Sequence, residues 1–213
     1  HALPWTLLGT GILWFGWFGF NAGSALAANA IAAQALLNTI IAPAAAMLGW
    51  LLVEKIKGKH VTTLGAASGA VAGMVAITPC AGFVGTGPSL IIGFAAGIIC
   101  YLALFIKEAA KLDDALDVIA VHLVGGIFGS IALGLFAAAA VNEIIPDRLL
   151  MGRGGEPPVD QIVAVVAVFA FAFVVTYVIA QAIQKTIGLR VDEETEDIGL
   201  DQALHAETAY NNL

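Results

Sequence analysis

The chain has 213 residues, of which 60% are hydrophobic and only 12% are charged, and its formal net charge is −7. This composition excludes an ordinary soluble domain, in which about a quarter of the residues are charged. Because a helix needs roughly 20 apolar residues to cross about 30 Å of hydrocarbon, the long uncharged runs predict an all-α, polytopic transmembrane bundle.

Six runs are long enough to be membrane-spanning helices, and charged or Gly- and Pro-rich breaks separate most of them. The break between the first two is the least distinct. Acidic residues concentrate after Arg190, so the net charge says little about the membrane part. We expect a transmembrane domain of six spans at residues 1–189 and an acidic cytoplasmic tail at 190–213. The predicted spans are residues 4–25, 28–53, 61–79, 85–106, 116–138 and 159–183.

The first predicted span mixes aromatic rings, an amide and a hydroxyl into an apolar run. Leu13, Trp17, Phe20 and Ser24 fall on one helix face, because their spacings of four, three and four residues follow the 3.6-residue period. The stripe is either a packing or interfacial surface, or one whose rings attract a small cation. The Ser24 hydroxyl either joins that surface or bonds back to the carbonyl four residues earlier. We expect the Asn21 amide to pair with another helix.

Regularly spaced glycines predict close helix contacts, because small residues let helix backbones approach one another in lipid. We assign these glycines to packing and give them no chemistry. They are Gly9, Gly16 and Gly23 in the first span, Gly65, Gly69 and Gly73 in the third, Gly93 and Gly97 in the fourth, and Gly125 and Gly129 in the fifth.

The third span ends in a helix-breaking segment, residues 78–82, which is either an ordinary loop or a re-entrant bend. Cys80 and Cys100 lie in or beside spans, so we expect small apolar residues there and no disulfide. Residues 141–160 are rich in Gly and Pro and predict an external loop.

His122 lies in the middle of the fifth predicted span, where an ionisable residue is costly. On an α-helix it would share a face with Val118, Gly125 and Gly129. Two interpretations remain: a structural imidazole bonded to a neighbouring helix, or a pore-lining imidazole that accepts or passes a proton.

Three acidic residues precede His122. Asp117 lies about 140° round the helix from the imidazole, so the two form no obvious acid and base pair. Asp113, Asp114 and Asp117 are expected near a helix N-terminus, where negative charge is favoured, with Asp117 as a helix-end acid.

Basic residues predict the orientation, because cytoplasmic loops carry the excess of Lys and Arg. Seven of the nine fall on one side of a six-span model, and only Arg148 and Arg153 fall on the other. Both chain ends are therefore expected in the cytoplasm. Since the chain begins at His1 without a Met, we expect a fragment of something longer.

Several segments together resemble the Amt/Mep/Rh family of ammonium transporters, in the family's order and over essentially the whole chain. The resemblance covers the sixth to the eleventh span, which is one half of an inverted-repeat transporter fold plus an extra C-terminal helix. The segments are residues 16–24 (GWFGFNAGS), 69–73 (GAVAG), 78–79 (TP), 117–122 (DVIAVH), 125–126 (GG) and 188–191 (GLRV).

The resemblance implies roles for single residues. Ser24 resembles the hydroxyl of the external ammonium-recruiting site, and Phe20 resembles one of two stacked gate rings. Trp17 resembles a pore-lining ring, and His122 resembles the second of twin pore histidines. Leu13 and Val118 would line the same wall. The first histidine, the other gate ring and the external Trp would belong to the missing first half.

The family's mechanism would be recruitment of NH4+ from outside, loss of its proton, and passage of neutral NH3 along an apolar pore while histidines relay the proton. Separating the proton lowers the barrier, because burying a charge is far more costly than burying a neutral molecule. Methylammonium would serve as an analogue. The resemblance also implies a homotrimer in the cell membrane, with membrane lipid around it, and a PII-type regulator at residues 190–213, although this tail is otherwise read as a mobile end.

A sensor acting through the cytoplasmic tail is the alternative function. An enzyme is not expected, because one intramembrane His, no HExxH and no GxSxG provide neither a metal cluster nor an activated nucleophile. We expect no catalytic residues, no metal, no cofactor and no nucleic-acid partner.

Overall fold

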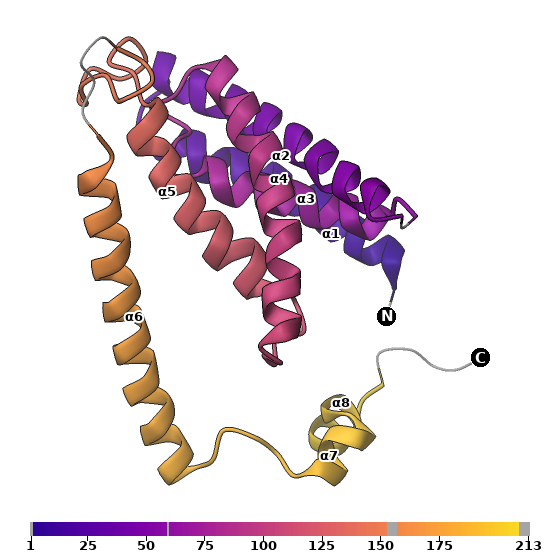
Figure 1. Ribbon diagram of the computed structural model, residues 1–213. Helices are drawn as coiled ribbons and strands as arrows, with labels where there is room; N and C mark the ends of the chain where they lie inside the picture. The colour runs from indigo at the N-terminus through magenta and orange to yellow at the C-terminus, as the bar shows by residue number, and fades with distance from the viewer. Residues whose placement is uncertain (1, 59, 153–156, 209–213) are drawn as a thin grey trace. The chain divides into compact units, whose positions relative to one another are not determined.

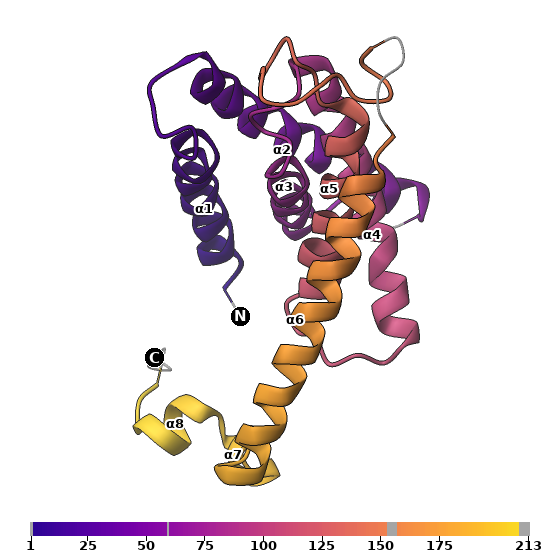
Figure 2. The ribbon, with the colours of Figure 1, turned by 90° about the vertical axis from the view of Figure 1, so that its left-hand side faces the viewer.

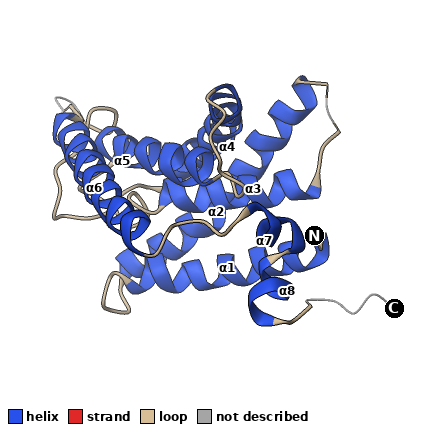
Figure 3. Ribbon diagram, turned by 90° about the horizontal axis from the view of Figure 1, so that it is seen from below, coloured by secondary structure: helices blue, strands red, loops and turns tan. Residues whose placement is uncertain are grey.

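The computed structural model describes residues 2–58, 60–152 and 157–208. The elements in these ranges are all helices (Figure 3), which confirms the predicted all-α class. Two basic residues used to predict the orientation, Lys59 and Arg153, lie outside the described residues, as does the end of the tail.

A helix forms in each of the six predicted ranges, within a few residues of the expected bounds. The fifth range divides into a π-helical turn, η1, and an α-helix, and two short helices follow in the tail. The elements are α1 (Leu3–Gly23), α2 (Ala30–Ile56), α3 (Thr63–Ile77), α4 (Thr86–Ala109), η1 (Ile119–Val124), α5 (Gly125–Phe136), α6 (Val159–Thr186), α7 (Glu193–Ile198) and α8 (Leu200–His205).

Four helical segments of the described residues are long and apolar enough to cross a membrane: α2, α4, the continuous segment Ile119–Phe136, and α6. The apolar helix α3 is shorter, with 15 residues. The helix α1 has 21 residues, and its Gly and Trp residues lower its mean hydropathy, so it falls outside this set. Side-chain caps fix two helix starts, because Asn29 accepts from the N–H of Ala32 and Thr62 accepts from that of Gly65.

Helices α2 and α3 lie between α1 and α4 (Figures 1 and 2), and α1 contacts α2 and α3. The α2–α4 interface depends on glycine, because a Cβ at Gly93 would overlap the backbone of Ala42 and a Cβ at Gly97 would overlap that of Ala46. Two further predicted packing glycines are enclosed as tightly: Gly73 of α3 lies against Ala46, and Gly129 of α5 lies against α3. The packing interpretation is confirmed at these positions.

The glycines of α1 behave differently. A Cβ at Gly9, Gly16 or Gly23 would meet no atom within 4 Å of the described chain. The packing interpretation of these three glycines therefore has no support within this chain.

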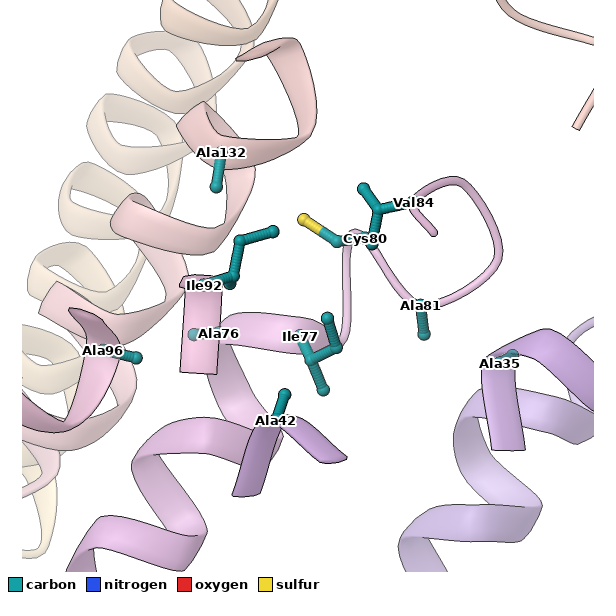
Figure 4. Close-up of a cluster of buried hydrophobic side chains, with 10 residues drawn as sticks. All are labelled: Ala35, Ala42, Ala76, Ile77, Cys80, Ala81, Val84, Ile92, Ala96 and Ala132. Carbon is teal, nitrogen blue, oxygen red and sulfur yellow. The ribbon is translucent and has the colours of Figure 1, made fainter. Parts of the chain in front are cut away.

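Small side chains fill the core between the helices (Figure 4). Alanines from α2, α3 and α4 meet there, and the larger Ile77 and Ile92 fill the remaining space. Cys80 and Cys100 are buried and free, which confirms the prediction that they act as small apolar residues without a disulfide. The cluster consists of Ala35, Ala42, Ala76, Ile77, Cys80, Ala81, Val84, Ile92, Ala96 and Ala132.

The helix-breaking segment after α3 is a buried turn that leads into α4. Asn38 of α2 donates hydrogen bonds to the carbonyl oxygens of Ala81 (2.9 Å) and Val84 (2.8 Å). These bonds satisfy backbone groups that a membrane interior would otherwise leave unpaired. A further bond comes from the loop after α5, where the side-chain amide of Asn142 donates to the carbonyl oxygen of Gly82.

The chain divides into two compact units, residues 1–165 and 166–213. The second unit therefore holds most of α6 together with the tail. Its short helix α7 is capped by Asp192, whose carboxylate accepts from the N–H of Thr195, and this bond holds the pKa of Asp192 below its ordinary value. Arg190 pairs with Glu196 at 2.8 Å.

Candidate functional site

A cavity of about 340 Å³ lies between α1, η1 and α5 and is lined by several of the predicted site residues. Trp17 and Phe20 reach it from α1, and His122 reaches it from η1. The structure therefore brings His122 to the same cavity as Trp17 and Phe20, which lie more than 100 positions earlier in the sequence. The lining is completed by Val75, Thr78, Pro79, Gly126 and Ser130.

The π-helical turn decides which way His122 faces. Gly125 and Gly129 are buried against α3, whereas His122 is exposed and lines the cavity with Gly126 and Ser130. The expectation that His122 shares a face with Gly125 and Gly129 is therefore wrong. It assumed a 3.6-residue period, but a π turn closes hydrogen bonds over five residues and so shifts the register.

A second cavity, of about 300 Å³, adjoins the first at Phe20 and Thr78, because these two residues line both. Ser24 and Asn21 reach the second cavity from α1. Asn142 and Ile144 reach it from the loop after α5. Phe20 and Thr78 are thus the residues that the space beside Ser24 and the space beside His122 have in common.

Hydrogen bonds fix the aromatic wall between the cavities. The indole N–H of Trp17 donates to the hydroxyl of Thr78 at 2.8 Å, and that hydroxyl donates to the carbonyl oxygen of Met74 at 2.7 Å. The Trp17 and Phe20 ring centroids lie 5.8 Å apart with a tilt of 53°. Because Thr78 both accepts and donates, it holds the Trp17 ring at a set position.

The Ser24 hydroxyl donates to the carbonyl oxygen of Phe20 at 2.7 Å, which confirms the bond to the carbonyl four residues earlier. This bond lies at the end of α1 beside the second cavity and does not remove Ser24 from its lining. The predicted pairing of Asn21 with another helix is also confirmed, because its amide donates to the Thr39 hydroxyl of α2 at 3.0 Å.

Among the described residues, Leu13 and Val118 line neither of the two cavities. Both side chains are exposed, at 44% and 47%. The structure thus places Trp17, Phe20, Ser24 and His122 along the two cavities, and it leaves Leu13 and Val118 outside them.

The acidic residues before η1 have separate partners. The Asp114 carboxylate accepts from the N–H groups of Val118 (2.9 Å) and Ile119 (2.8 Å), so Asp114 caps the helix start. These bonds, that of Ile119 first, hold the pKa of Asp114 below its ordinary value, and the charge of Lys107 acts in the same direction. Asp117 lies at the same helix end and forms an ion pair with Lys107.

Sequence reasoning missed three polar residues that line the cavities. Thr78 was noticed only as part of a helix-breaking segment, although a hydroxyl beside Pro79 signals a polar group near a span end. Ser130 had no usable signal relative to His122, because the π turn that carries His122 breaks the α-helical period. Asn142 had no sequence signal, because it reaches the second cavity from a loop, where no helical period applies. Among the described residues, no cluster of three or more His, Cys, Asp or Glu side chains is placed to hold a metal ion.

Nearly the whole chain matches a protein family. The model of the Ammonium Transporter Family matches residues 1–210. The chain belongs to the ammonium transporter family. The transporters of this family are integral membrane proteins, in agreement with the apolar helices described above.

The relatives are proteins about twice as long as this chain. A putative ammonium transporter of Methanothermobacter thermautotrophicus is 49% identical over 211 residues, which cover 99% of this chain and 52% of that protein. An ammonium transporter of Bacillus subtilis is 47% identical over 213 residues, which cover 100% of this chain and 52% of that protein. This chain therefore spans about half the length of the curated relatives it matches.

Solved structures of the family share the fold. Mep2 of Saccharomyces cerevisiae aligns with a TM-score of 0.80 and 34% identity, over 88% of this chain and 43% of that one. A structure described as a sensor Amt protein aligns with a TM-score of 0.85 and 33% identity, over 96% of this chain and 49% of that one. These matches confirm the helical membrane-transporter fold predicted from the sequence.

Proposed function

We propose that this ammonium transporter chain forms one wall of a path that moves ammonium across the cell membrane. The observation that carries the proposal is the pair of adjoining cavities, one beside Ser24 and one beside His122, which share Phe20 in their lining. In this proposal Ser24 is the recruiting group, Phe20 the aromatic barrier and His122 the ionisable group of one path.

Ser24 and Phe20 are proposed to recruit NH4+ in the second cavity. A cation over an aromatic face gains roughly 0.5–2 kcal/mol, and a hydroxyl oxygen adds a hydrogen bond. Together they replace part of the water that a small ammonium ion loses on entry. Asn21 is paired with Thr39 and supports the α1 end of this cavity.

Phe20 is proposed as a gate ring, since it lines both cavities. Beyond it, Trp17 and His122 line a space whose other walls are mainly apolar. A charged ion is far more costly to place there than neutral ammonia. His122 would accept or pass the proton that ammonium gives up, because a neutral imidazole has one ring nitrogen that accepts a proton and a second that can release one. Leu13 and Val118 are proposed as further apolar lining of the same wall.

The remaining expectations concern the whole protein. They are a homotrimer surrounded by membrane lipid, the cell membrane as location, a cytoplasmic C-terminus, and a PII-type regulator at residues 190–213. The transmembrane part is proposed to end at residue 189, where the acidic tail begins. We propose no enzymatic activity, since the relatives carry the names of transporters.

An ammonium sensor is the second candidate, favoured by the alignment with the sensor Amt protein. A sensor on this fold would use the same recruiting residues, bind the ion without moving it, and signal through the tail.

The test is ammonium-evoked current measured together with labelled methylammonium uptake, with the full-length protein in liposomes. Uptake above that of empty liposomes supports transport, and loss of proportional current in His122→Ala supports the proton role of His122. Ligand binding without uptake overturns transport in favour of the sensor. Unchanged uptake and current in both Ser24→Ala and His122→Ala would contradict the site assignment.

A further inference from the structure

The segment that leads into η1 has a backbone conformation that its sequence alone does not explain. Asp117 has φ 56°, in the left-handed region, although it is not a glycine. Asp enters this region more readily than most residues, but still needs surrounding contacts to remain there. The conformation lies directly before the helix that carries His122.

Lys107, in the last turn of α4, holds this segment at two points. Its ammonium group donates to the carbonyl oxygen of Asp114 at 2.9 Å and pairs with the carboxylate of Asp117. The Lys107 side chain is largely enclosed, with 17% of its surface exposed. One cation therefore ties both ends of the 114–117 segment to α4.

Backbone hydrogen bonds connect the 114–117 segment to the turn that carries His122. The carbonyl oxygen of Asp117 accepts from the N–H of Val121 at 2.9 Å, while the Asp114 carboxylate caps Val118 and Ile119. Val121 is buried in a core cluster that includes Cys100 of α4. His122, the next residue, faces the cavity.

We propose that Lys107 is a positioning residue for His122. By holding Asp117 in its left-handed conformation, Lys107 fixes where the helix starts and therefore which residue of the π turn faces the cavity. An α-helical register from a different start would turn the imidazole away from Trp17 and Phe20. The inference rests on the proposed function, because it assigns Lys107 an effect on the proton step at His122.

The test uses the full-length protein in liposomes and three variants. Lys107→Met removes the cation, Lys107→Arg retains it, and Lys111→Met removes an exposed positive charge from the loop directly after α4 as a matched control. The readout is the ratio of ammonium-evoked current to methylammonium uptake, recorded as a function of pH. A change in protein amount or overall rate alone does not alter this ratio.

Lys107→Met is expected to shift the ratio in the direction of His122→Ala, by about threefold or more, whereas Lys107→Arg and Lys111→Met retain the parent ratio and pH profile. In the His122→Ala background, Lys107→Met should shift it no further, because residues that act through one another are not additive. An unchanged ratio in Lys107→Met, an equal shift in Lys111→Met, or an additive shift in the double variant would overturn the inference.

Hydrogen exchange over residues 115–124 tests the positioning without transport. Faster exchange in Lys107→Met than in Lys111→Met supports it, and equal exchange overturns it. If the parent protein transports nothing, the proposed function fails while the exchange result still decides whether Lys107 holds the segment.

Discussion

The indole N–H of Trp14 in α1 donates a hydrogen bond of 2.8 Å to the carbonyl oxygen of Thr39 in α2. Four residues after Thr39 the helix contains Pro43, which has no N–H to give. Trp14 therefore supplies the donor that α2 lacks. In a lipid environment an unpaired carbonyl costs several kcal/mol, so this bond fastens α1 to α2 at a defined height.

Trp14→Phe is expected to destabilise the full-length protein by about 1–3 kcal/mol, because it leaves that carbonyl unpaired. Thermal unfolding in detergent measures the loss. In a Pro43→Ala background the helix provides its own N–H, so the same substitution should cost less. Trp5→Phe, on an exposed ring, is the control. Equal losses with and without Pro43 would contradict this account.

Gly97→Ala is expected to lower stability by roughly 1–3 kcal/mol, because the added Cβ overlaps the backbone of Ala46 and forces α2 and α4 apart. Gly87→Ala on the same helix is the matched control, since a Cβ there meets no atom within 4 Å. The unfolding midpoints of the two variants, each compared with that of the parent, measure the loss of stability. A tolerated alanine at Gly97 would mean that the two helices approach less closely than described.

Ser24→Ala should weaken recruitment at the second cavity. Hydrogen bonds to charged groups contribute about 1.5–3 kcal/mol, so the apparent KM for ammonium is expected to rise about tenfold or more. The maximal rate should change less, since the barrier beyond Phe20 is untouched. Ser24→Thr keeps the hydroxyl and should retain most of the affinity. A normal KM in the alanine variant would remove Ser24 from the recruiting site.

The helix cap at Asp114 predicts a dependence of stability on pH. The folded protein lowers the pKa of this carboxyl, so its stabilisation is fully present above the unfolded value of about 3.9 and is lost as the pH falls through the lower folded value. Asp114→Asn has no such carboxylate. The unfolding temperature of the parent should therefore fall towards that of Asp114→Asn below about pH 4. Parallel curves for the two proteins would exclude the cap as the cause.

The helices were predictable because a long uncharged run has few alternatives to a helix in a membrane. Each predicted range does contain a helical segment. The helix face on which His122 lies was not predictable, because the periodicity argument assumes an α-helix. Nothing in the local sequence IAVHLV distinguishes a π turn from an α-helix. The place of Thr78 could not be predicted either. Its role depends on Trp17, a partner 61 residues away whose indole reaches it only after α1 packs beside α3.

The Ser24 hydroxyl donates its hydrogen bond to the carbonyl oxygen of Phe20, so Ser24 itself offers the second cavity only the lone pairs of its oxygen. At this oxygen a guest can only donate hydrogen bonds, so the number of N–H groups that the guest brings matters. Ammonium points an N–H group along each of its tetrahedral directions. Each methyl group that is added replaces one of these N–H groups, and a potassium ion has none. Occupancy beside Ser24 would then fall stepwise along the methylated amines, so that the serine distinguishes its guests by their hydrogens although their charge is the same.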